Sequence, residues 1–260
     1  ERNHIGPIAT NAQGTLYFAN LADSAIYQLD NDGSVSLFQE VGFRPASMSV
    51  GPDAKLYVSD PASKRVFAFA GDNQATLVMR ELAVDKLLAS PKGLYFTEVG
   101  NRNINLLAPN GRSILKANLG AEARAFCLSA EQSFLNVALA DQVFGYSFRL
   151  GQQGALSAGQ AYIHYHIPYG QSTPRPQAIC VDQNNFSYTA TNMGIQVADQ
   201  LGRGQFIMQT PSLRKQALAF GGDARNQLYL VSDGKLYRRQ VNRQGAQSSI
   251  KAQKPREPRM

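Results

Sequence analysis

A short apolar triplet recurs six times along the chain and constrains the fold more than any other feature. Its copies begin at Leu16, Leu56, Leu94, Leu135, Phe186 and Leu228, at intervals of 40, 38, 41, 51 and 42 residues. Most copies follow a turn sequence, and a second alternating strand and a further apolar run follow each copy, whereas no stretch has a sustained helical period. Each unit therefore holds four short strands. Four-stranded sheets repeated radially are the blades of a β-propeller, so the chain is predicted to be all-β, with six blades of four antiparallel strands.

The repeat also predicts how the blades follow one another. Residues 1–250 are expected to form a single domain of contiguous blades, with blade six taking its outermost strand from about 248–251. The inner strands should begin near Ile5, Pro45, Val84, Ala123, Pro176 and Gln216. Residues 251–260 hold two prolines and several charges, so we expect a basic, disordered tail whose removal costs little stability.

Composition excludes several classes of function. A hydrophobic content of 43% with 17% charged residues is typical of a folded core, and the sequence has no apolar run long enough to span a bilayer. The net charge is +7, of which the tail contributes +3 through four basic residues and one acidic residue; the remainder forms no basic run. We therefore expect no nucleic-acid partner. The chain begins at Glu1, so we expect an excised or processed piece of a longer chain. We also expect the protein to be soluble, and monomeric or weakly oligomeric.

One interval is about ten residues longer than the others, and the excess lies in blade four between 149 and 175. A single long connection on a rigid scaffold is a natural ligand-covering loop, so His164, Tyr165 and His166 are candidate lid residues. His164 and His166 are spaced like neighbours on one face of a strand. This spacing fits a pair of metal ligands that needs further partners, or simply the polar face of an amphipathic hairpin.

Three motifs carry a resemblance to a known family. Ile5-Gly6-Pro7 precedes the first blade, Pro176-Gln177-Ala178 opens the fifth, and Phe220-Gly221-Gly222 is followed by Leu228-Tyr229 in the sixth. Together they resemble the senescence-marker-protein/gluconolactonase family, over nearly the whole chain. NHL-type propellers share the Pro-x-x-x and Leu-Tyr-Val-x-Asp sequence patterns seen at 45–60.

The resemblance implies a divalent-metal site at the central channel that hydrolyses sugar lactones. In this sequence Ile5 stands where the family has a glutamate, Arg124 where it has an asparagine, and Gln177 where it has an aspartate. Only Asp85 keeps a possible oxygen ligand. Because Arg carries a permanent charge and no lone pair, we predict that the metal site is lost and that no metal or other cofactor is bound there.

The four positions should converge at one channel mouth, where two arrangements are open. Arg124 either binds an anion or a sugar, together with Gln177, or pairs with Asp85 and fills the opening. Cys127 and Cys180 are expected to be small buried residues of inner strands, with a disulfide or thiol chemistry as the alternative.

Three functions remain open on this evidence. The leading hypothesis is a gluconolactonase-like propeller that has lost its metal site and binds a small ligand or a protein partner at the channel mouth. The second is a lactone or ester hydrolase with a rebuilt site that uses Asp85 or Glu98. The third is an NHL-like protein-interaction scaffold, since propellers support all of these functions.

Overall fold

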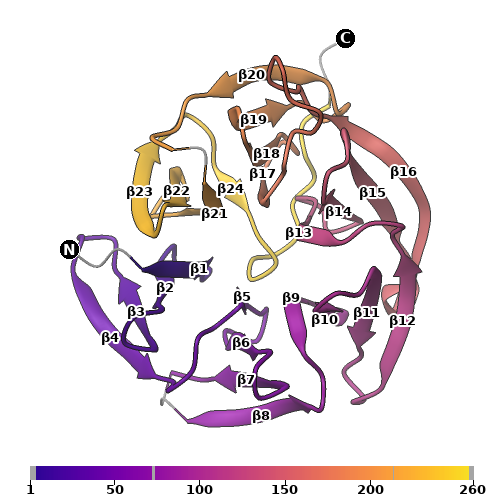
Figure 1. The fold of residues 1–260 in the computed structure, drawn as a ribbon. Helices are drawn as coiled ribbons and strands as arrows, with labels where there is room; N and C mark the ends of the chain where they lie inside the picture. The colour runs from indigo at the N-terminus through magenta and orange to yellow at the C-terminus, as the bar shows by residue number, and fades with distance from the viewer. Residues whose placement is uncertain (1–3, 72–73, 213, 258–260) are drawn as a thin grey trace.

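A computed structural model describes residues 4–71, 74–212 and 214–257, and confirms the predicted six-bladed β-propeller. Figure 1 looks along the central channel and shows the six blades arranged around it in chain order. The first three blades consist of β1 (Ile5–Thr10), β2 (Leu16–Asn20), β3 (Ala25–Leu29), β4 (Val35–Glu40), β5 (Ser47–Val50), β6 (Leu56–Asp60), β7 (Arg65–Phe69), β8 (Ala75–Arg80), β9 (Val84–Ser90), β10 (Gly93–Glu98), β11 (Asn103–Leu107) and β12 (Ser113–Asn118). The other three consist of β13 (Ala123–Leu128), β14 (Phe134–Leu139), β15 (Phe144–Leu150), β16 (Leu156–His164), β17 (Ala178–Asp182), β18 (Ser187–Thr191), β19 (Gly194–Ala198), β20 (Gly204–Met208), β21 (Lys215–Gly221), β22 (Gln227–Ser232) and β23 (Lys235–Gln240).

The core of the molecule lies between the blades rather than within any one of them. Among the described residues, six apolar clusters are found, one between each pair of neighbouring blades. Tyr95 and Leu106 of blade three, for example, pack against Phe126 and Leu135 of blade four. The alternation of the short strands explains this arrangement, because each sheet buries both of its faces against neighbours.

The blades are contiguous and the ring closes without an exchanged strand, as predicted. β1 to β4 form blade one in order, and within residues 4–71, 74–212 and 214–257 no strand from the end of the chain joins that sheet. Blades one and six are instead joined by backbone hydrogen bonds from Ile5 N to Gly234 O and from Gly222 N to Gly14 O, both of 2.9 Å. The cluster of Ile5, Phe18, Tyr229 and Val231 fills the same junction.

The outermost strand that we expected for blade six is wrong. In the described residues this blade has three strands, and the last strand of the chain, β24 (Gly245–Ala246), pairs with the inner strand β17 of blade five. Its two residues lie opposite Asp182 and Val181. Gly245 makes this route possible, because a Cβ there would lie 2.1 Å from the Cβ of Phe220.

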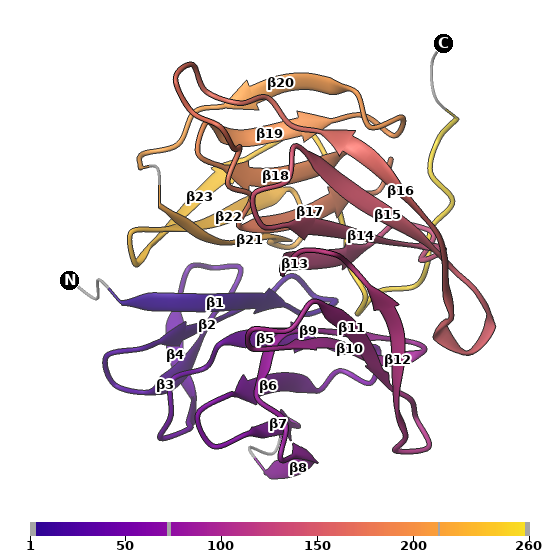
Figure 2. The same cartoon turned by 45° about the vertical axis from the view of Figure 1, so that its right-hand side comes forward.

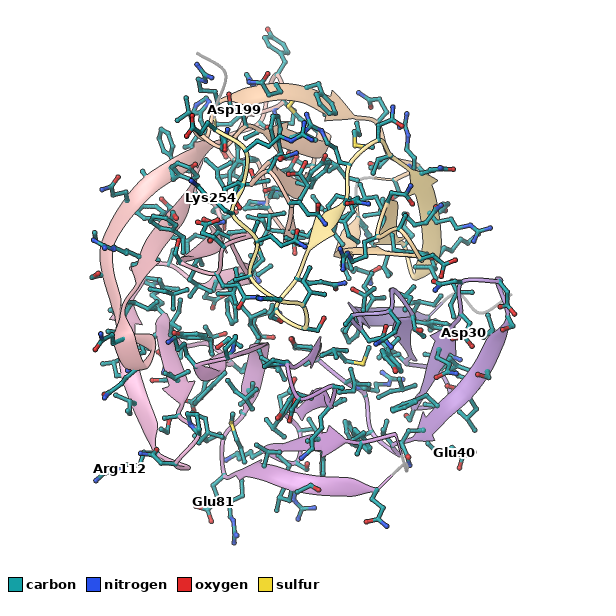
Figure 3. All side chains as sticks on the ribbon, turned by 180° about the vertical axis from the view of Figure 1, so that it is seen from behind. Asp30, Glu40, Glu81, Arg112, Asp199 and Lys254 are labelled. Atoms are coloured by element: carbon teal, nitrogen blue, oxygen red, sulfur yellow. The ribbon has the colours of Figure 1, made fainter. Side chains whose placement is uncertain are left out.

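After β24 the chain crosses one end of the central channel. The side chain of Gln247 hydrogen-bonds Thr10 and donates to Asn11 O at 3.1 Å, and Ser248 Oγ donates to Val50 O at 3.3 Å. Gln132 Nε2 then donates to Ile250 O at 2.8 Å on blade four. Figure 3, seen from behind, shows this segment in front of the ring, running from its centre outward past Lys254.

The tail beyond residue 250 has no regular secondary structure where it is described, and most of its side chains are exposed. One backbone hydrogen bond, from Gln253 N to Ala130 O at 2.9 Å, attaches it to blade four. Residues 258–260 lie outside the described residues, and the disorder of 251–260 remains a prediction. Of the described part of the chain, no helix is long and apolar enough to cross a membrane.

Candidate functional site

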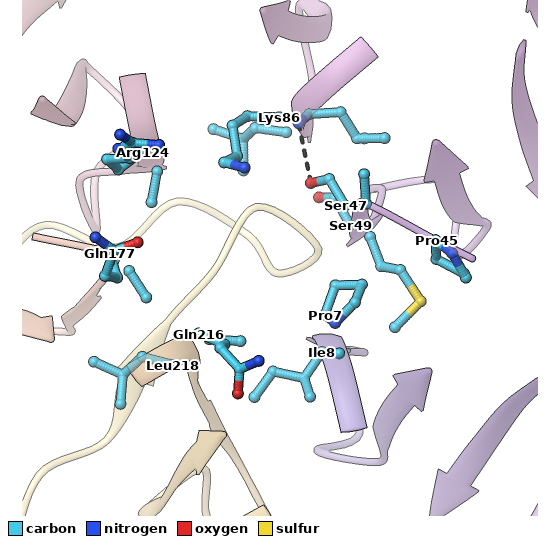
Figure 4. A pocket seen from close by; sticks show the side chains of 18 of the residues that line it. Pro7, Ile8, Pro45, Ser47, Ser49, Lys86, Arg124, Gln177, Gln216 and Leu218 are labelled. Carbon is cyan, nitrogen blue, oxygen red and sulfur yellow. Dashed lines mark hydrogen bonds between the residues drawn. The ribbon is translucent and has the colours of Figure 1, made fainter. Parts of the chain in front are cut away.

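A cavity of about 390 Å³ opens at the end of the channel where the inner strands begin (Figure 4). All six inner strands, or the residues just before them, contribute to its wall. Its apolar side is formed by residues such as Pro7, Ile8 and Leu218. Its polar groups come from five blades: Ser47, Ser49, Lys86, Arg124, Gln177 and Gln216. A ring of short strands thus brings side chains from distant parts of the sequence to one opening.

β-bulges set which side chains face this opening. The pairing of β9 with β10 skips Asp85, that of β13 with β14 skips Arg124, and that of β21 with β22 skips Gln216. In blade one the register also shifts, between Ile5 and Ile8. A bulge adds one residue to a strand and redirects the side chains beside it, and bulges are frequent beside functional sites.

Two cationic side chains border the mouth. Lys86 and Arg124 line the cavity, and no carboxylate is among its described lining residues. Each cation lies close to a carboxylate that is one or two residues away in sequence. Lys86 Nζ lies 2.8 Å from Asp85 Oδ1, and a guanidinium nitrogen of Arg124 lies 3.7 Å from Glu122 Oε2. These pairs are partly exposed and hold little energy, so the two cations are available to an anion that enters the cavity.

Two of the four predicted site residues line this cavity and two do not. Arg124 and Gln177 border the opening as expected. Ile5 is 8% exposed and packs against Leu16 and Phe18 in the junction between blades six and one. Asp85 occupies the bulge and turns to Lys86, which lines the cavity in its place.

The ion pair that we considered between Arg124 and Asp85 is not formed. Arg124 pairs with Glu122 and Asp85 pairs with Lys86, so no salt bridge among the described residues spans the opening. Glu98, the other acid considered for a rebuilt hydrolase site, does not line the cavity either. The mouth is thus a cavity with cationic and amide groups on its wall and an apolar lining between them.

The lining does not suit the divalent cation of the resembled family. A hard dication binds oxygen ligands, usually with carboxylates among them, and this wall offers only hydroxyl, amide and backbone oxygens beside two cations. In the described part of the chain, no three His, Cys, Asp or Glu side chains come together in a way that could hold a metal ion.

The three lid candidates do not border the channel mouth. Tyr165 is 1% exposed and packs with Ile163 and Ile179 between blades four and five, so its ring cannot stack on a ligand. His164 and His166 line a separate cavity at the outer side of these blades. The extra length of blade four is divided between the β15–β16 hairpin, in which β16 is the longest strand described and which Figure 2 shows at the periphery of the propeller, and the connection of 165–177 between β16 and β17.

The far end of the channel is narrow and closed by the chain itself. A space of about 120 Å³ is bounded by inner strands and by Ala246, Gln247 and Ser248 of the crossing segment. A ligand that enters the mouth therefore faces the crossing segment at the other end of the channel. Nothing in the sequence motifs signals this closure.

Cys127 and Cys180 line this inner space as free thiols. Cys180 is buried as expected, whereas Cys127 is only partly buried, so the prediction that both are buried holds for Cys180 alone. Burial raises the pKa of the Cys127 thiol to about 12, with a small opposing effect of a hydrogen bond to Asn136, and burial also raises the pKa of Cys180 well above its ordinary value. A raised pKa means less thiolate, the reactive form, at any pH near neutrality.

We therefore expect both thiols to resist alkylation in the native protein. From the shift at Cys127 alone, its thiolate fraction at a mildly alkaline pH falls by about a thousandfold relative to an ordinary thiol. Mass spectrometry after iodoacetamide treatment of native and denatured protein measures this. Native labelling at the rate of an exposed thiol would contradict the burial described here.

Comparison with known proteins supports the fold. No family model matches the chain, and no curated protein matches it. Solved structures do: a gluconolactonase from Xanthomonas campestris has a TM-score of 0.76 at 19% identity, over 90% of this chain and 84% of that one. A luciferin-regenerating enzyme has a TM-score of 0.78 at 13% identity over 96% of both chains. A calcium-binding regucalcin from Agrobacterium tumefaciens has a TM-score of 0.70 at 14% identity, over 87% of this chain and 81% of that one.

These similarities place the chain among six-bladed propellers of the gluconolactonase and regucalcin type in fold. The resemblance drawn from the three sequence motifs is thereby confirmed at the level of architecture. The identities are too low to transfer an activity, and fold alone does not determine function.

Proposed function

We propose that this chain is a gluconolactonase-like propeller that has lost the metal-dependent lactonase site and binds a small anionic ligand at the channel mouth. The observation that carries the proposal is the lining of the mouth: Lys86 and Arg124 face a cavity without a lining carboxylate. A carboxylate matches the planar fork of an arginine, and a lysine adds a second positive charge. Sugar acids, which combine a carboxylate with several hydroxyls, fit this wall best.

The neutral groups of the mouth support recognition of hydroxyls. Gln177 and Gln216 lie on neighbouring blades, and Ser47 lies across the opening from them (Figure 4). Gln216 Oε1 accepts a hydrogen bond from Gly234 N at 3.0 Å, which holds that side chain in place. Amide and hydroxyl groups both donate and accept, so they can bind a polyhydroxylated ligand without strong selection for one stereoisomer.

Binding of an anion at this site should depend on the salt concentration. The Arg124 side chain is 38% exposed and that of Lys86 is 27% exposed, so solvent ions screen both charges. Affinity for an anion should therefore fall as ionic strength rises. Apolar residues such as Pro7 and Leu218 limit water around the ligand and strengthen the remaining contacts.

The alternatives have less support. A rebuilt hydrolase needs a base or a nucleophile at the mouth, yet Asp85 and Glu98 do not line the cavity and the two thiols have raised pKa values. An interaction scaffold would be favoured by a continuous apolar patch. The exposed apolar side chains of Leu37, Leu77, Leu115 and Phe206 instead lie on the outer strands of four different blades.

The proposal is tested by titrating gluconate into the protein in a calorimeter, with and without calcium or manganese. We expect binding that is independent of either metal and that weakens with added salt. We also expect no metal-stimulated hydrolysis of gluconolactone, because the described lining offers no carboxylate ligand to a dication and places two cations beside it. Lactone turnover that rises with calcium or manganese would contradict the proposal.

A further inference from the structure

A second cavity, of about 250 Å³, lies where blade four meets blade five, away from the channel mouth. It is bordered by the end of β16, by β19 and by β20, which Figure 2 shows along the same side of the molecule. Apolar side chains such as Met193 and Ile207 form its floor. Two imidazoles, those of His164 and His166, stand on its wall, and neither has a role in the function proposed above.

The two histidines are presented on the same side of the chain. His164 and His166 are exposed, while Tyr165 between them is 1% exposed and points into the core. This alternation is the one that an extended chain imposes. The centroids of the two imidazole rings lie 5.8 Å apart, and the rings are inclined by 78°.

The backbone that carries this pair is held at each of its three residues. His164 N donates to Gly202 O at 3.3 Å, and Tyr165 N donates to Val143 O at 2.9 Å. His166 is held twice by the amide of Gln196, which accepts from its N and donates to its O, both at 2.8 Å. Gln196 is itself 6% exposed. The backbone that carries the two imidazoles is therefore fixed in advance of any ligand, which lowers the entropic cost of chelation.

Gly204 leaves space beside the two imidazoles. A side chain at residue 204 would crowd one imidazole, because a Cβ on Gly204 would lie 3.1 Å from His166 Nε2. Phe144 packs on the other side of His164, at 5.2 Å between ring centroids, and restricts how that ring turns.

We propose that His164 and His166 form a chelating site for a borderline transition-metal dication, with Cu²⁺ bound more tightly than Zn²⁺. Two imidazoles that bind one ion at about 2.0–2.1 Å have centroids about 5 Å apart at a tetrahedral angle and about 4.5 Å apart at the right angle of a tetragonal copper site, so the rings here need to approach by about 1 Å. Imidazole nitrogen suits copper and zinc, and a given nitrogen site holds copper more tightly. The remaining coordination positions face the cavity, where water or a small anion completes the shell.

The experiment is a titration with Cu²⁺ at about pH 7.5, where imidazoles are largely neutral and able to bind metal. It is carried out in the His4→Asn background, which removes the only other histidine of the chain. Calorimetry gives the affinity, and electron paramagnetic resonance counts the nitrogens bound to copper. We expect one ion bound with two imidazole nitrogens.

Single substitutions His164→Asn and His166→Asn should each weaken Cu²⁺ binding at least about tenfold, since outer-shell partners alone are worth about 10–100-fold. Each should also reduce the spectrum to one imidazole nitrogen. Both side chains are exposed, so thermal unfolding of the two variants should match the background protein and exclude misfolding. Unchanged affinity in both variants, or a spectrum with a single imidazole in the background protein, would overturn the proposal.

Discussion

Replacing Arg124 by glutamine should weaken gluconate binding by roughly ten- to hundredfold and leave the fold unchanged. Hydrogen bonds to charged groups are worth about 1.5–3 kcal/mol, which converts to a loss of this size. Arg124 is the side chain at the mouth that can hold a carboxylate by two parallel hydrogen bonds, and glutamine keeps part of its length without the charge. Calorimetric titration at low and high salt measures the effect.

Two further variants separate this contact from a general effect of charge. Arg124→Lys keeps the charge and loses the fork, so its affinity should fall between that of the wild type and that of Arg124→Gln. Arg149→Gln removes one positive charge from β15, away from the cavity, and should leave the affinity nearly unchanged. Equal losses in Arg124→Gln and Arg149→Gln would show that net charge, and not this site, determines binding.

The sequence predicts the propeller because the same strand pattern is repeated six times at similar intervals. Five of the six triplets lie within the second strand of a blade, and the fifth enters its strand one residue after Phe186. The inner strands begin within a few residues of the predicted positions. Six weak patterns that agree in spacing leave little freedom to the fold. The Leu16 and Leu228 triplets also explain closure, since their strands β2 and β22 flank the junction between blades one and six.

The site is predicted less well because bulges are invisible in the repeat. Aligning the inner strands by spacing assigns Asp85 to the mouth, whereas the bulge at that residue makes Lys86 line it. In a strand, a shift of one residue moves a side chain to the opposite face, so a single extra residue reverses the charge assigned to the wall. Gln216 was expected only as the start of a strand, although its place in the repeat matches that of Arg124.

The route of the chain end could not be predicted for a different reason. Residues 245–250 contain no apolar alternation that would assign them to a sheet, and their partners come from four blades far away in sequence: Asp182, Thr10, Val50 and Gln132. Such contacts depend on the completed ring. Local patterns carry no signal for them, which is why the expected outer strand of blade six was wrong.

Substituting Gly245 by alanine should lower the free energy of unfolding by about 1–3 kcal/mol, the usual cost of overpacking a core. The new Cβ would lie 2.1 Å from the Cβ of Phe220, a buried residue that is 3% exposed, so β24 or blade six must move. Gly71→Ala is the matched control, because its Cβ would meet nothing within 4 Å. Urea denaturation compares the two, and the control should lie within about 0.5 kcal/mol of the wild type.

Removing the whole crossing segment should cost more than the alanine. Deletion of 245–260 takes away the pairing with β17 and the hydrogen bonds to Asn11, Val50 and Gln132, each worth about 0.5–1.5 kcal/mol, and opens the inner end of the channel to water. We expect a loss of about 3 kcal/mol or more. Deletion of 254–260 alone should stay within about 0.5 kcal/mol, because Gln253 N makes the last backbone hydrogen bond described for the tail. If both deletions leave the urea midpoint unchanged, the crossing segment does not stabilise the propeller. If the shorter deletion is as costly as the longer one, the stabilising contacts lie in the basic tail, whose charges would then have to pair with groups on the propeller.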